Sequence, residues 1–537
     1  MPHWKRVGGW LALMAALLPA AAFVYRYRAM PHFGFLLDDA IYVTCARSLA
    51  EGAGYKIASL PGAPWQTKYP PGYSWMLSWI WSAAPAFPAN LRWIAALGGL
   101  SLAAAVLLAR RVGRDLGLDS RWAVAAAALC ALNPPAIFYS ASAMSDIPGL
   151  ALMLASFVLM TEGARRHCVW LALAAGLVGA AAFLTRSAFL ALLATAPAWF
   201  LWKRQWRGAA AFAAAMLPCV AGWQLWSRAH HSLDPSPQIR FYVDYLGYLS
   251  ANFSAADIPA VAAANFQTLV QSAGRVLWFD PDAGALVSLW RTILLLLALA
   301  GVWRLSRRAL HPYTIFAVLY SSILLPWNFS PNERFLLPLL PLLMAGLTES
   351  ARQILDALRT LWRRGGLADR GFAGAVFAGL AVAVVLWASA FSQGLGYLRT
   401  LMEREKTRFA MDRAAGQWAG AYLPAGSTVV THQESRFHLL SGLRAIGMPL
   451  PSKTGYGGVR KEITAYFDSV KDIARQRRAR YLYVTPSSFE LDLDTEERAA
   501  WLARIRADPE WREIFAMRGH SIFELGASAT YSDIESR

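Results

Sequence analysis

Long apolar segments, separated by short polar ones, fill most of the chain up to Phe391. A helix needs about 20 apolar residues to cross a bilayer, and about 17 can suffice. Eleven segments meet or approach this length, which predicts a polytopic α-helical membrane protein of about 11 transmembrane helices. The predicted spans are residues 7–25, 91–109, 122–138, 146–161, 168–184, 188–202, 209–226, 283–303, 312–327, 335–347 and 372–391.

A different pattern begins at Leu395. Residues 427–431, 480–485 and 521–525 place Val, Tyr, Ile and Phe between polar residues, as in β-strands. Residues 461–478 and 496–506 have the spacing of amphipathic helices. We therefore expect a transmembrane domain over residues 1–394 and a small soluble α/β domain over residues 395–537. That domain could bind an acceptor or only cover a cavity.

Basic residues gather between the apolar segments. Short loops rich in Lys and Arg remain on the cytoplasmic side of a membrane. With the predicted spans, every cluster falls on one side, which places the C-terminal domain outside, in the periplasm of a Gram-negative bacterium. The clusters are Lys5 and Arg6; Arg110, Arg111 and Arg114; Arg165 and Arg166; Lys203, Arg204 and Arg207; Arg304, Arg307 and Arg308; and Arg363 and Arg364.

This topology requires that residues 71–87 do not cross the membrane, although they are apolar enough to do so. Their aromatic side chains suit a helix that lies in the membrane interface. These side chains are Tyr73, Trp75, Trp79 and Trp81. We expect a juxtamembrane helix within a first outer loop of residues 28–90. An ordinary span, with one error elsewhere in the topology, is the alternative.

The composition agrees with a membrane protein, because 56% of the 537 residues are hydrophobic and only 16% are charged, against about 25% charged in soluble chains. The formal charge of +18 could indicate nucleic acid. However, the Lys and Arg residues lie at the ends of apolar runs, without a basic patch that contains aromatic residues, so no nucleic-acid partner is expected. The four cysteines are scattered and indicate neither a disulfide framework nor metal-ligand spacing.

Several ionisable residues lie outside the basic clusters, and the topology places all of them on the outer side. They are Asp38, Asp39, Lys68, Asp146, Arg186, Glu333 and Arg334. Charges at membrane depth are costly and usually mark function. Carboxylates and cations from distant segments on one side predict a single cavity, which would hold an acidic group such as a phosphate together with a group that needs a base.

The carboxylates also have a structural interpretation. Asp38 and Asp39 could cap the helix that follows them, but an adjacent pair caps no better than one residue, which favours function. Asp146 stands two residues before Pro148 and is equally well explained as a helix cap.

The arginines have an alternative as well. Arg186 and Arg334 could extend to the outer headgroups. Topology does not favour Arg at outer helix ends, so binding of a phosphate is the preferred interpretation.

Three segments of the first loop resemble the first periplasmic loop of C-type (GT-C) glycosyltransferases. They read Asp38-Asp39-Ala40-Ile41-Tyr42, Gly52-Ala53-Gly54-Tyr55 and Lys68-Tyr69-Pro70-Pro71-Gly72-Tyr73. Further matches are Ser145-Asp146-Ile147-Pro148, Leu184-Thr185-Arg186 and the run from Glu333 and Arg334 through Phe335 to Pro341. The resemblance covers most of the membrane domain. It is strongest to bacterial relatives of the protein O-mannosyltransferases and to the lipid A aminoarabinose transferases.

This resemblance implies an inverting transfer from a polyprenyl-phosphate sugar donor, reached from the membrane lipid, to a periplasmic lipid, glycan or protein acceptor. It implies that Asp38 or Asp39 acts as the base or positions the acceptor, and that Asp146 is the second acidic site. Lys68 is similar to the phosphate-facing lysine of the family. Here Tyr69 separates it from the prolines, so the resemblance does not extend to aminoarabinose specificity.

The chemistry of such a transfer agrees with these residues. A phosphate leaving group needs cations rather than an acid, and Lys68, Arg186 and Arg334 could supply them. Tyr69 and Glu333 complete the expected phosphate-binding set, and the acceptor hydroxyl needs a base. Some relatives hold a divalent metal, but no ligand cluster stands out in this sequence. We therefore expect an inner-membrane glycosyltransferase.

The alternative function is a transporter or flippase of lipid-linked sugars. Such a protein typically has repeated halves and spans broken near the middle of the membrane. The sequence contains no visible repeat, and its outer charges lie at one face.

Overall fold

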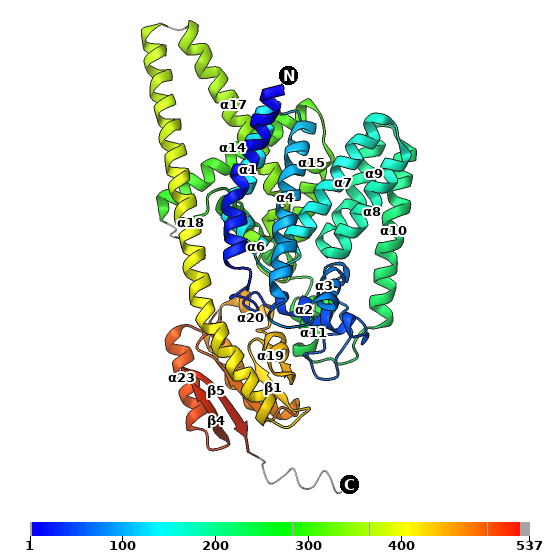
Figure 1. Cartoon of the computed structure of the whole chain (residues 1–537), viewed down its shortest axis with the longest axis vertical. Coiled ribbons are helices and arrows are strands. Elements are labelled where there is room, and N and C mark those ends of the chain that lie inside the picture. The colour runs from blue at the N-terminus through cyan, green and yellow to red at the C-terminus, as the bar shows by residue number, and fades with distance from the viewer. Residues whose placement is uncertain (1–2, 282–283, 365, 491, 527–537) are drawn as a thin grey trace.

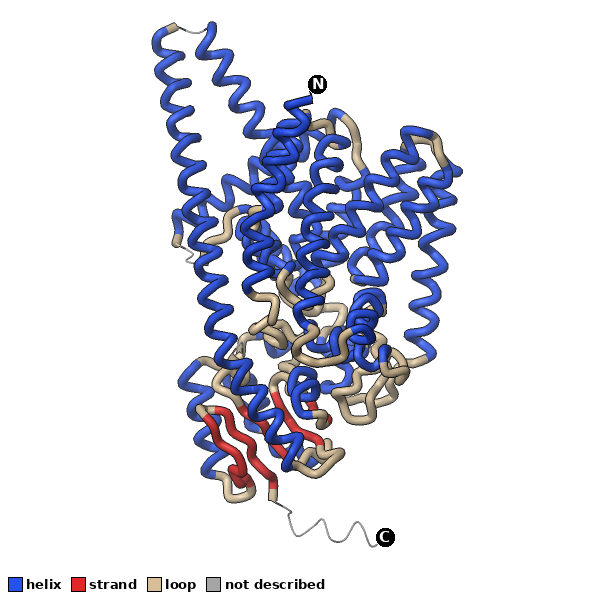
Figure 2. Tube along the Cα trace, in the orientation of Figure 1, coloured by secondary structure: helices blue, strands red, loops and turns tan. Residues whose placement is uncertain are grey.

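The computed structural model describes residues 3–281, 284–364, 366–490 and 492–526. A bundle of helices forms most of the molecule, and a sheet lies at the end opposite the N-terminus (Figure 1). All described strands belong to that end (Figure 2).

The first half of the chain forms α1 (His3–Arg26), α2 (Asp38–Ala50), α3 (Gly72–Ala83), α4 (Leu91–Asp115), α5 (Ser120–Ala131), α6 (Pro134–Ser140), α7 (Asp146–Arg166), α8 (Val169–Thr185), η1 (Ser187–Leu190), α9 (Ala191–Trp202), α10 (Trp206–Ala229), α11 (Pro237–Val243), α12 (Tyr245–Asn252) and α13 (Ile258–Leu277). The second half forms α14 (Ala285–Arg308), α15 (Pro312–Leu324), α16 (Glu333–Leu336), η2 (Leu337–Leu339), α17 (Leu340–Arg364), α18 (Leu367–Tyr422), β1 (Thr428–Thr431), α19 (Glu434–Ser441), β2 (Arg444–Ile446), α20 (Ser452–Gly457), α21 (Arg460–Asp468), α22 (Val470–Gln476), β3 (Tyr481–Val484), α23 (Thr495–Ala507), β4 (Trp511–Met517) and β5 (His520–Leu525).

The apolar helices confirm a multi-pass membrane protein. Among the described residues, seven helices are long and apolar enough to span, and the bent pair α5–α6 makes an eighth. Three further apolar helices are shorter: Val169–Thr185, Ser187–Trp202 and Pro312–Leu324. These elements follow the order of the eleven predicted spans. By length and composition, however, seven or eight of the eleven qualify, because the shorter three have 17 residues or fewer.

The span predicted over residues 122–138 is bent. Helices α5 and α6 meet at 60°. Pro134 and Pro135 have no amide hydrogen, so the helical hydrogen bonds cannot continue through them. The Asn133 side chain starts α6 by accepting a hydrogen bond from the amide of Ala136 at 3.1 Å, and it also donates to the carbonyl of Val276 at 2.7 Å.

Helix α3 corresponds to the predicted juxtamembrane helix. Its 12 residues extend about 18 Å, whereas the apolar core of a bilayer is about 30 Å thick. Trp75 and Trp79 are exposed, and Tyr73 and Leu77 are buried. A helix of this length is too short to cross the membrane, and the predicted topology requires that this segment does not cross.

Helix α18 joins the bundle to the sheet. Its 56 residues extend about 84 Å, far beyond the thickness of a membrane. The predicted domain boundary after residue 394 therefore falls inside one continuous helix. The last turns of α18 lie on the sheet, where Ala415 and Ala419 pack with Val429 and Tyr481.

The sheet has the strand order β2-β1-β3-β5-β4. Strand β1 is parallel to β2 and β3, and β5 is antiparallel to β3 and β4. On the face away from α18, Phe467 and Trp501 pack into a core with Leu482 and Phe523. The three predicted strands correspond to β1, β3 and β5.

Two features of this end differ from the sequence prediction. Strands β2 and β4 were not predicted, since β2 has three residues and β4 is interrupted by an irregular register between Glu513 and Phe515. The helix predicted over residues 461–478 is broken at Ser469, whose hydroxyl donates to the carbonyl of Tyr466 at 2.6 Å. Such local bonds compete with the helical pattern.

Candidate active site

The outer charged residues come together because alternate helices begin or end at the same face of the bundle. Helix α7 begins at Asp146 and ends at Arg165 and Arg166. The two arginines form ion pairs with Asp115 and Glu162, at the ends of α4 and α7. Asp146 is thus one helix length away from that basic end, on the face nearer the sheet.

Two guanidinium groups and two carboxylates are joined by ion pairs at this face. Arg334, in the short helix α16, donates from Nη1 to Asp38 Oδ2 at 2.6 Å and from Nε to Asp146 Oδ2 at 3.0 Å. Arg186, which follows α8, forms an ion pair with the other oxygen of Asp146. We call Asp38, Tyr69, Asp146, Arg186 and Arg334 the charged cluster. Its carboxylates and cations are joined by the strongest class of hydrogen bond.

Burial makes the charged cluster unusual. Asp146 is fully buried, and Arg186 is 7% exposed. The ring of Phe335 lies against both guanidinium groups, 5.1 Å from that of Arg186 and 5.8 Å from that of Arg334. Unpaired charges at such depth would be very costly. Asp38 is the more accessible carboxylate, with 19% of its side chain exposed.

Tyr69 and Lys68 extend the site along the first loop. The Tyr69 hydroxyl donates to Asp38 Oδ1 at 2.6 Å. The Lys68 ammonium donates to the carbonyl of Phe241 at 2.7 Å and lies over the rings of Tyr245 and Phe329. Burial lowers the pKa of Lys68 to about 8, although the charge of Asp38 opposes this.

The pKa of Asp38 lies below its usual value. Burial alone would raise it, but the charges of Arg334 and Lys68 and the hydrogen bond from Tyr69 outweigh burial. At neutral pH Asp38 is therefore an ionised carboxylate between two cations.

Asp39 lies outside the charged cluster. It is fully buried, and its oxygens accept from the amides of Gly34 at 2.8 Å and Ala40 at 2.9 Å. Burial raises the pKa of Asp39 to about 7, although these two backbone hydrogen bonds oppose the shift. Arg436 of α19 donates to the carbonyl of Phe33 in the same turn at 2.9 Å, so Asp39 and Arg436 both hold the turn before α2.

Glu333 also points elsewhere. Its carboxylate pairs with Arg275 of α13 at 2.7 Å, although Arg334 is its neighbour in the chain. Of the residues named from the sequence, the structure brings together Asp38, Tyr69, Asp146, Arg186 and Arg334. It places Lys68 beside them and Asp39 and Glu333 to the side.

The contacts of the carboxylates do not follow the capping interpretation. The N-cap residues of α2 and α7 are Leu37 and Ser145, and neither side chain forms a capping hydrogen bond. Asp38 and Asp146 are the first helical residues, and their side chains are held by arginines.

Aromatic residues complete the surroundings, and the sequence analysis did not find them. Phe241, Tyr245 and Phe329 enclose Lys68, and the Tyr42 hydroxyl lies 3.2 Å from the hydroxyl of Ser145. The available signal was the density of aromatic residues from 241 to 248. Hydropathy does not predict that residues 241–248 pack against the first loop.

A divalent metal does not fit the charged cluster as it stands. Within the described parts of the chain, no group of three His, Cys, Asp or Glu side chains is arranged to hold a metal ion. Guanidinium groups already contact both carboxylates, at the positions that a cation would take.

The fold has solved counterparts. ArnT from Cupriavidus metallidurans, bound to undecaprenyl phosphate, aligns over 95% of this chain and 98% of its own, with 13% identity and a TM-score of 0.53. The oligosaccharyltransferase AglB from Archaeoglobus fulgidus, in complex with an inhibitory peptide and a dolichol-phosphate, aligns over 98% of this chain and 75% of its own. Its identity is 12% and its TM-score is 0.52.

No protein-family model and no curated protein sequence matches the chain. At 12–13% identity the structural likeness concerns the fold. It confirms the fold that the motifs of the first loop indicated, the GT-C fold that ArnT and AglB share.

Proposed function

We propose that this protein is a glycosyltransferase that moves a sugar from a polyprenyl-phosphate donor to a lipid, glycan or protein acceptor. The observation that carries the proposal is the charged cluster at one face of a GT-C bundle. In it Arg334 bridges Asp38 and the buried Asp146, and Arg186 also pairs with Asp146. Both solved counterparts were determined with a polyprenyl phosphate, undecaprenyl phosphate or dolichol-phosphate. A ligand of that chemistry fits a membrane site rich in cations.

The donor phosphate would bind the cationic side of the cluster. Arg186, Arg334 and Lys68 offer donors whose charge offsets the negative charge that grows on the leaving phosphate. Asp146 holds both arginines in place, since it contacts each of them and is fully buried. Its role in this proposal is to position the cations rather than to exchange protons.

Asp38 would serve the acceptor. As the acceptor hydroxyl oxygen attacks the anomeric carbon, its proton passes to Asp38. The bond between that carbon and the phosphate oxygen breaks, and polyprenyl phosphate leaves with the electron pair. Attack opposite the leaving group inverts the anomeric centre.

The Arg334–Asp38 ion pair gives this base a means of activation. While Arg334 holds Asp38, the pKa of the carboxyl is low and the carboxylate is a weak base. When a donor phosphate draws the Arg334 guanidinium toward itself, the positive charge of Arg334 stabilises the Asp38 carboxylate less. The pKa of Asp38 then rises toward the range of an effective base. Donor binding would then prepare Asp38 to accept the proton.

Asp39 has a positioning role in this proposal. Because it is fully buried and held by backbone amides, it fixes the turn that precedes α2 and does not meet the acceptor. Of the two acidic residues of the first loop, Asp38 is therefore the proposed base.

The surrounding assignments follow the charge pattern. We place the protein in the bacterial inner membrane, with the basic clusters in the cytoplasm and the charged cluster on the periplasmic side. The division into a membrane domain of residues 1–394 and a periplasmic domain of residues 395–537 belongs to this proposal, with α18 as the shared element.

The test uses purified protein in nanodiscs with a panel of polyprenyl-phosphate sugars and a panel of lipid, glycan and peptide acceptors, and it measures release of polyprenyl phosphate. Wild type should release it with one donor, and Asp38→Asn should reduce the rate by about 100-fold or more, as expected for loss of a general base. Glu51→Gln is the matched control, because Glu51 follows the same helix, is half exposed and pairs only with Arg47 among the described residues. Equal turnover in all three proteins would remove Asp38 from the mechanism. Absence of both turnover and donor binding would overturn the proposal.

A further inference from the structure

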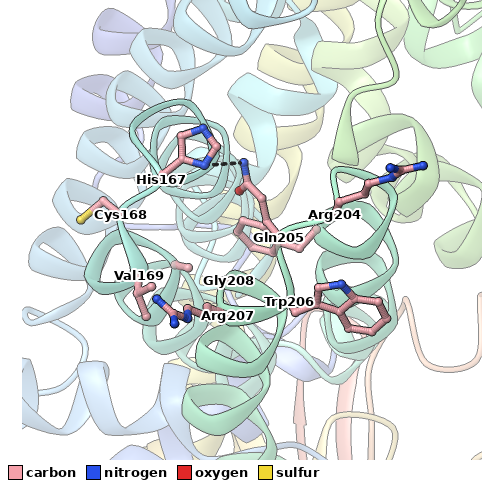
Figure 3. Close-up of a pocket in the computed structure, with 11 residues that line it drawn as sticks. His167, Cys168, Val169, Arg204, Gln205, Trp206, Arg207 and Gly208 are labelled. Carbon is pink, nitrogen blue, oxygen red and sulfur yellow. Dashed lines mark hydrogen bonds between the residues drawn. The ribbon is translucent and has the colours of Figure 1, made fainter.

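A second cationic site lies at the opposite end of the bundle, between the turn that joins α7 to α8 and the turn that joins α9 to α10. A cavity of about 430 Å³ opens there (Figure 3). Its polar lining comes from His167, Cys168, Arg204, Gln205 and Arg207, with Trp206 beside them. None of the residues that line it is acidic.

The two arginines have free charges. Arg204 and Arg207 are exposed, and neither forms an ion pair with a residue that the structure describes. Their neighbours in space behave differently, since Arg165 and Arg166 at the end of α7 are bound by Asp115 and Glu162. In Figure 3, Arg204 and Arg207 lie on opposite sides of Gln205, and the Arg204 side chain points outward. Long exposed side chains of this kind can turn toward a common anion.

The backbone adds to the positive potential. Helices α8 and α10 both begin at this cavity, and their N-cap residues, Cys168 and Gln205, provide no side-chain cap. Amide groups of a first turn carry partial positive charge and have no partner within the helix. The Gln205 amide group fixes the two turns together by donating to the carbonyl of Ala164 at 2.9 Å.

Aromatic side chains place the cavity at the level of lipid headgroups. Trp206 lines it, Trp170 and Trp202 lie in the adjoining turns of α8 and α9, and all three are 70–77% exposed. Exposed Trp gathers at membrane interfaces. Basic pockets between transmembrane helices bind anionic lipid headgroups.

We propose that this cavity binds the phosphate of an anionic phospholipid in the leaflet on the basic side of the protein. The proposal is independent of the glycosyltransferase function, because it uses neither the charged cluster nor the face on which that cluster lies. The phosphate would contact Arg204 and Arg207, and the acyl chains would lie along the apolar outer surface of α8 and α10.

Native mass spectrometry of the full chain in detergent tests the proposal, with phosphatidylglycerol and phosphatidylcholine of identical acyl chains as probes. Wild type should bind phosphatidylglycerol more tightly. Arg204→Ala/Arg207→Ala should weaken that binding about tenfold or more, because each arginine near an anionic lipid headgroup strengthens binding through electrostatic attraction. Arg114→Ala/Arg307→Ala is the matched control, because it removes two exposed charges of the basic clusters that also lack a described ion pair. It should bind like wild type.

Three outcomes would overturn the proposal: equal binding of phosphatidylglycerol by all three proteins, equal losses for both lipids, or displacement of phosphatidylglycerol by millimolar inorganic phosphate. The last result would identify a site for a free anion. All four positions are exposed, so thermal unfolding should be unchanged, which shows that any loss of binding does not come from misfolding.

Discussion

Asp38 and Asp39 are neighbours in the chain, yet their carboxylates lie in different surroundings. Asp38 is partly exposed and meets Arg334 and Tyr69, whereas Asp39 is sealed behind the turn and meets backbone amides. Their pKa values accordingly move in opposite directions. The sequence indicated that the pair carries function but left open which member does so. Leu37, the residue before the pair, has a φ of +60°, a backbone feature that no pattern of residues reveals.

The raised pKa of Asp39 gives a prediction about stability. Its folded-state value of about 7 lies above the usual 3.8, so the folded protein binds the proton more tightly. This stabilisation is complete below about pH 4 and is lost as the pH rises through 7. Asp39→Asn has no such proton. The melting temperature of the variant, minus that of wild type, should therefore rise between pH 5 and pH 8.

Thermal unfolding in detergent at pH 5, 6, 7 and 8 provides the measurement. Asn retains one of the two acceptor oxygens, so the variant loses a constant amount of stability at every pH. The prediction therefore concerns only how the difference in melting temperature changes with pH. A difference that stays flat or falls with pH would show that Asp39 is already ionised in the folded protein.

At the scale of elements, the sheet end and α2 meet at a glycine. Gly34 has a φ of +86°, and a Cβ at this position would lie 2.5 Å from Cδ of Arg436. The close approach lets Arg436 reach the carbonyl of Phe33 while the amide of Gly34 holds Asp39. The turn before Asp38 is thus held from both sides.

Gly34→Ala should therefore lower both the melting temperature and any activity that depends on Asp38. Gly52→Ala is the control, since its φ of +76° carries the same backbone penalty but a Cβ there meets nothing within 4 Å. That penalty is about 1–2 kcal/mol, and the clash at Gly34 adds to it. Equal losses of stability in the two variants, measured by thermal unfolding, would show that Arg436 moves aside freely.

The predicted elements succeeded where one signal was strong over many residues. Long apolar runs marked α4, α7, α10 and α14, and residues 71–87, which the charge rule required not to span, contain a helix of only 12 residues, α3. The bend between α5 and α6 was not predicted, although Pro134 and Pro135 carried its signal. The edge strands β2 and β4 are too short or too irregular for alternation to reveal them.

For the whole molecule, the charge rule predicted more than the individual motifs did. It put Asp38, Asp146, Arg186 and Arg334 on one side before any contact was known, and the structure joins those four residues by ion pairs. The charge rule could not predict that Glu333 pairs with Arg275, because the side of the membrane on which a residue lies does not determine where its side chain points. Nor could it reveal the aromatic surroundings of Lys68, which come from a segment more than 170 residues away.

We therefore propose two lipid-phosphate sites at opposite faces of the molecule, each of which contains two arginines. In the charged cluster Arg186 is buried, Arg334 is 13% exposed, and both are held by carboxylates, which suits the proposed positioning of a leaving group. In the cavity of Arg204 and Arg207 the charges are exposed and unpaired among the described residues, which suits a structural lipid.

An experimental structure of the protein with a bound polyprenyl phosphate tests the central claim most directly. We expect the phosphate to contact the guanidinium groups of Arg186 and Arg334, with the Arg334–Asp38 distance increased from 2.6 Å. A phosphate seated at Arg204 and Arg207 instead, with the ion pairs of the charged cluster unchanged, would contradict the assignment of the active site.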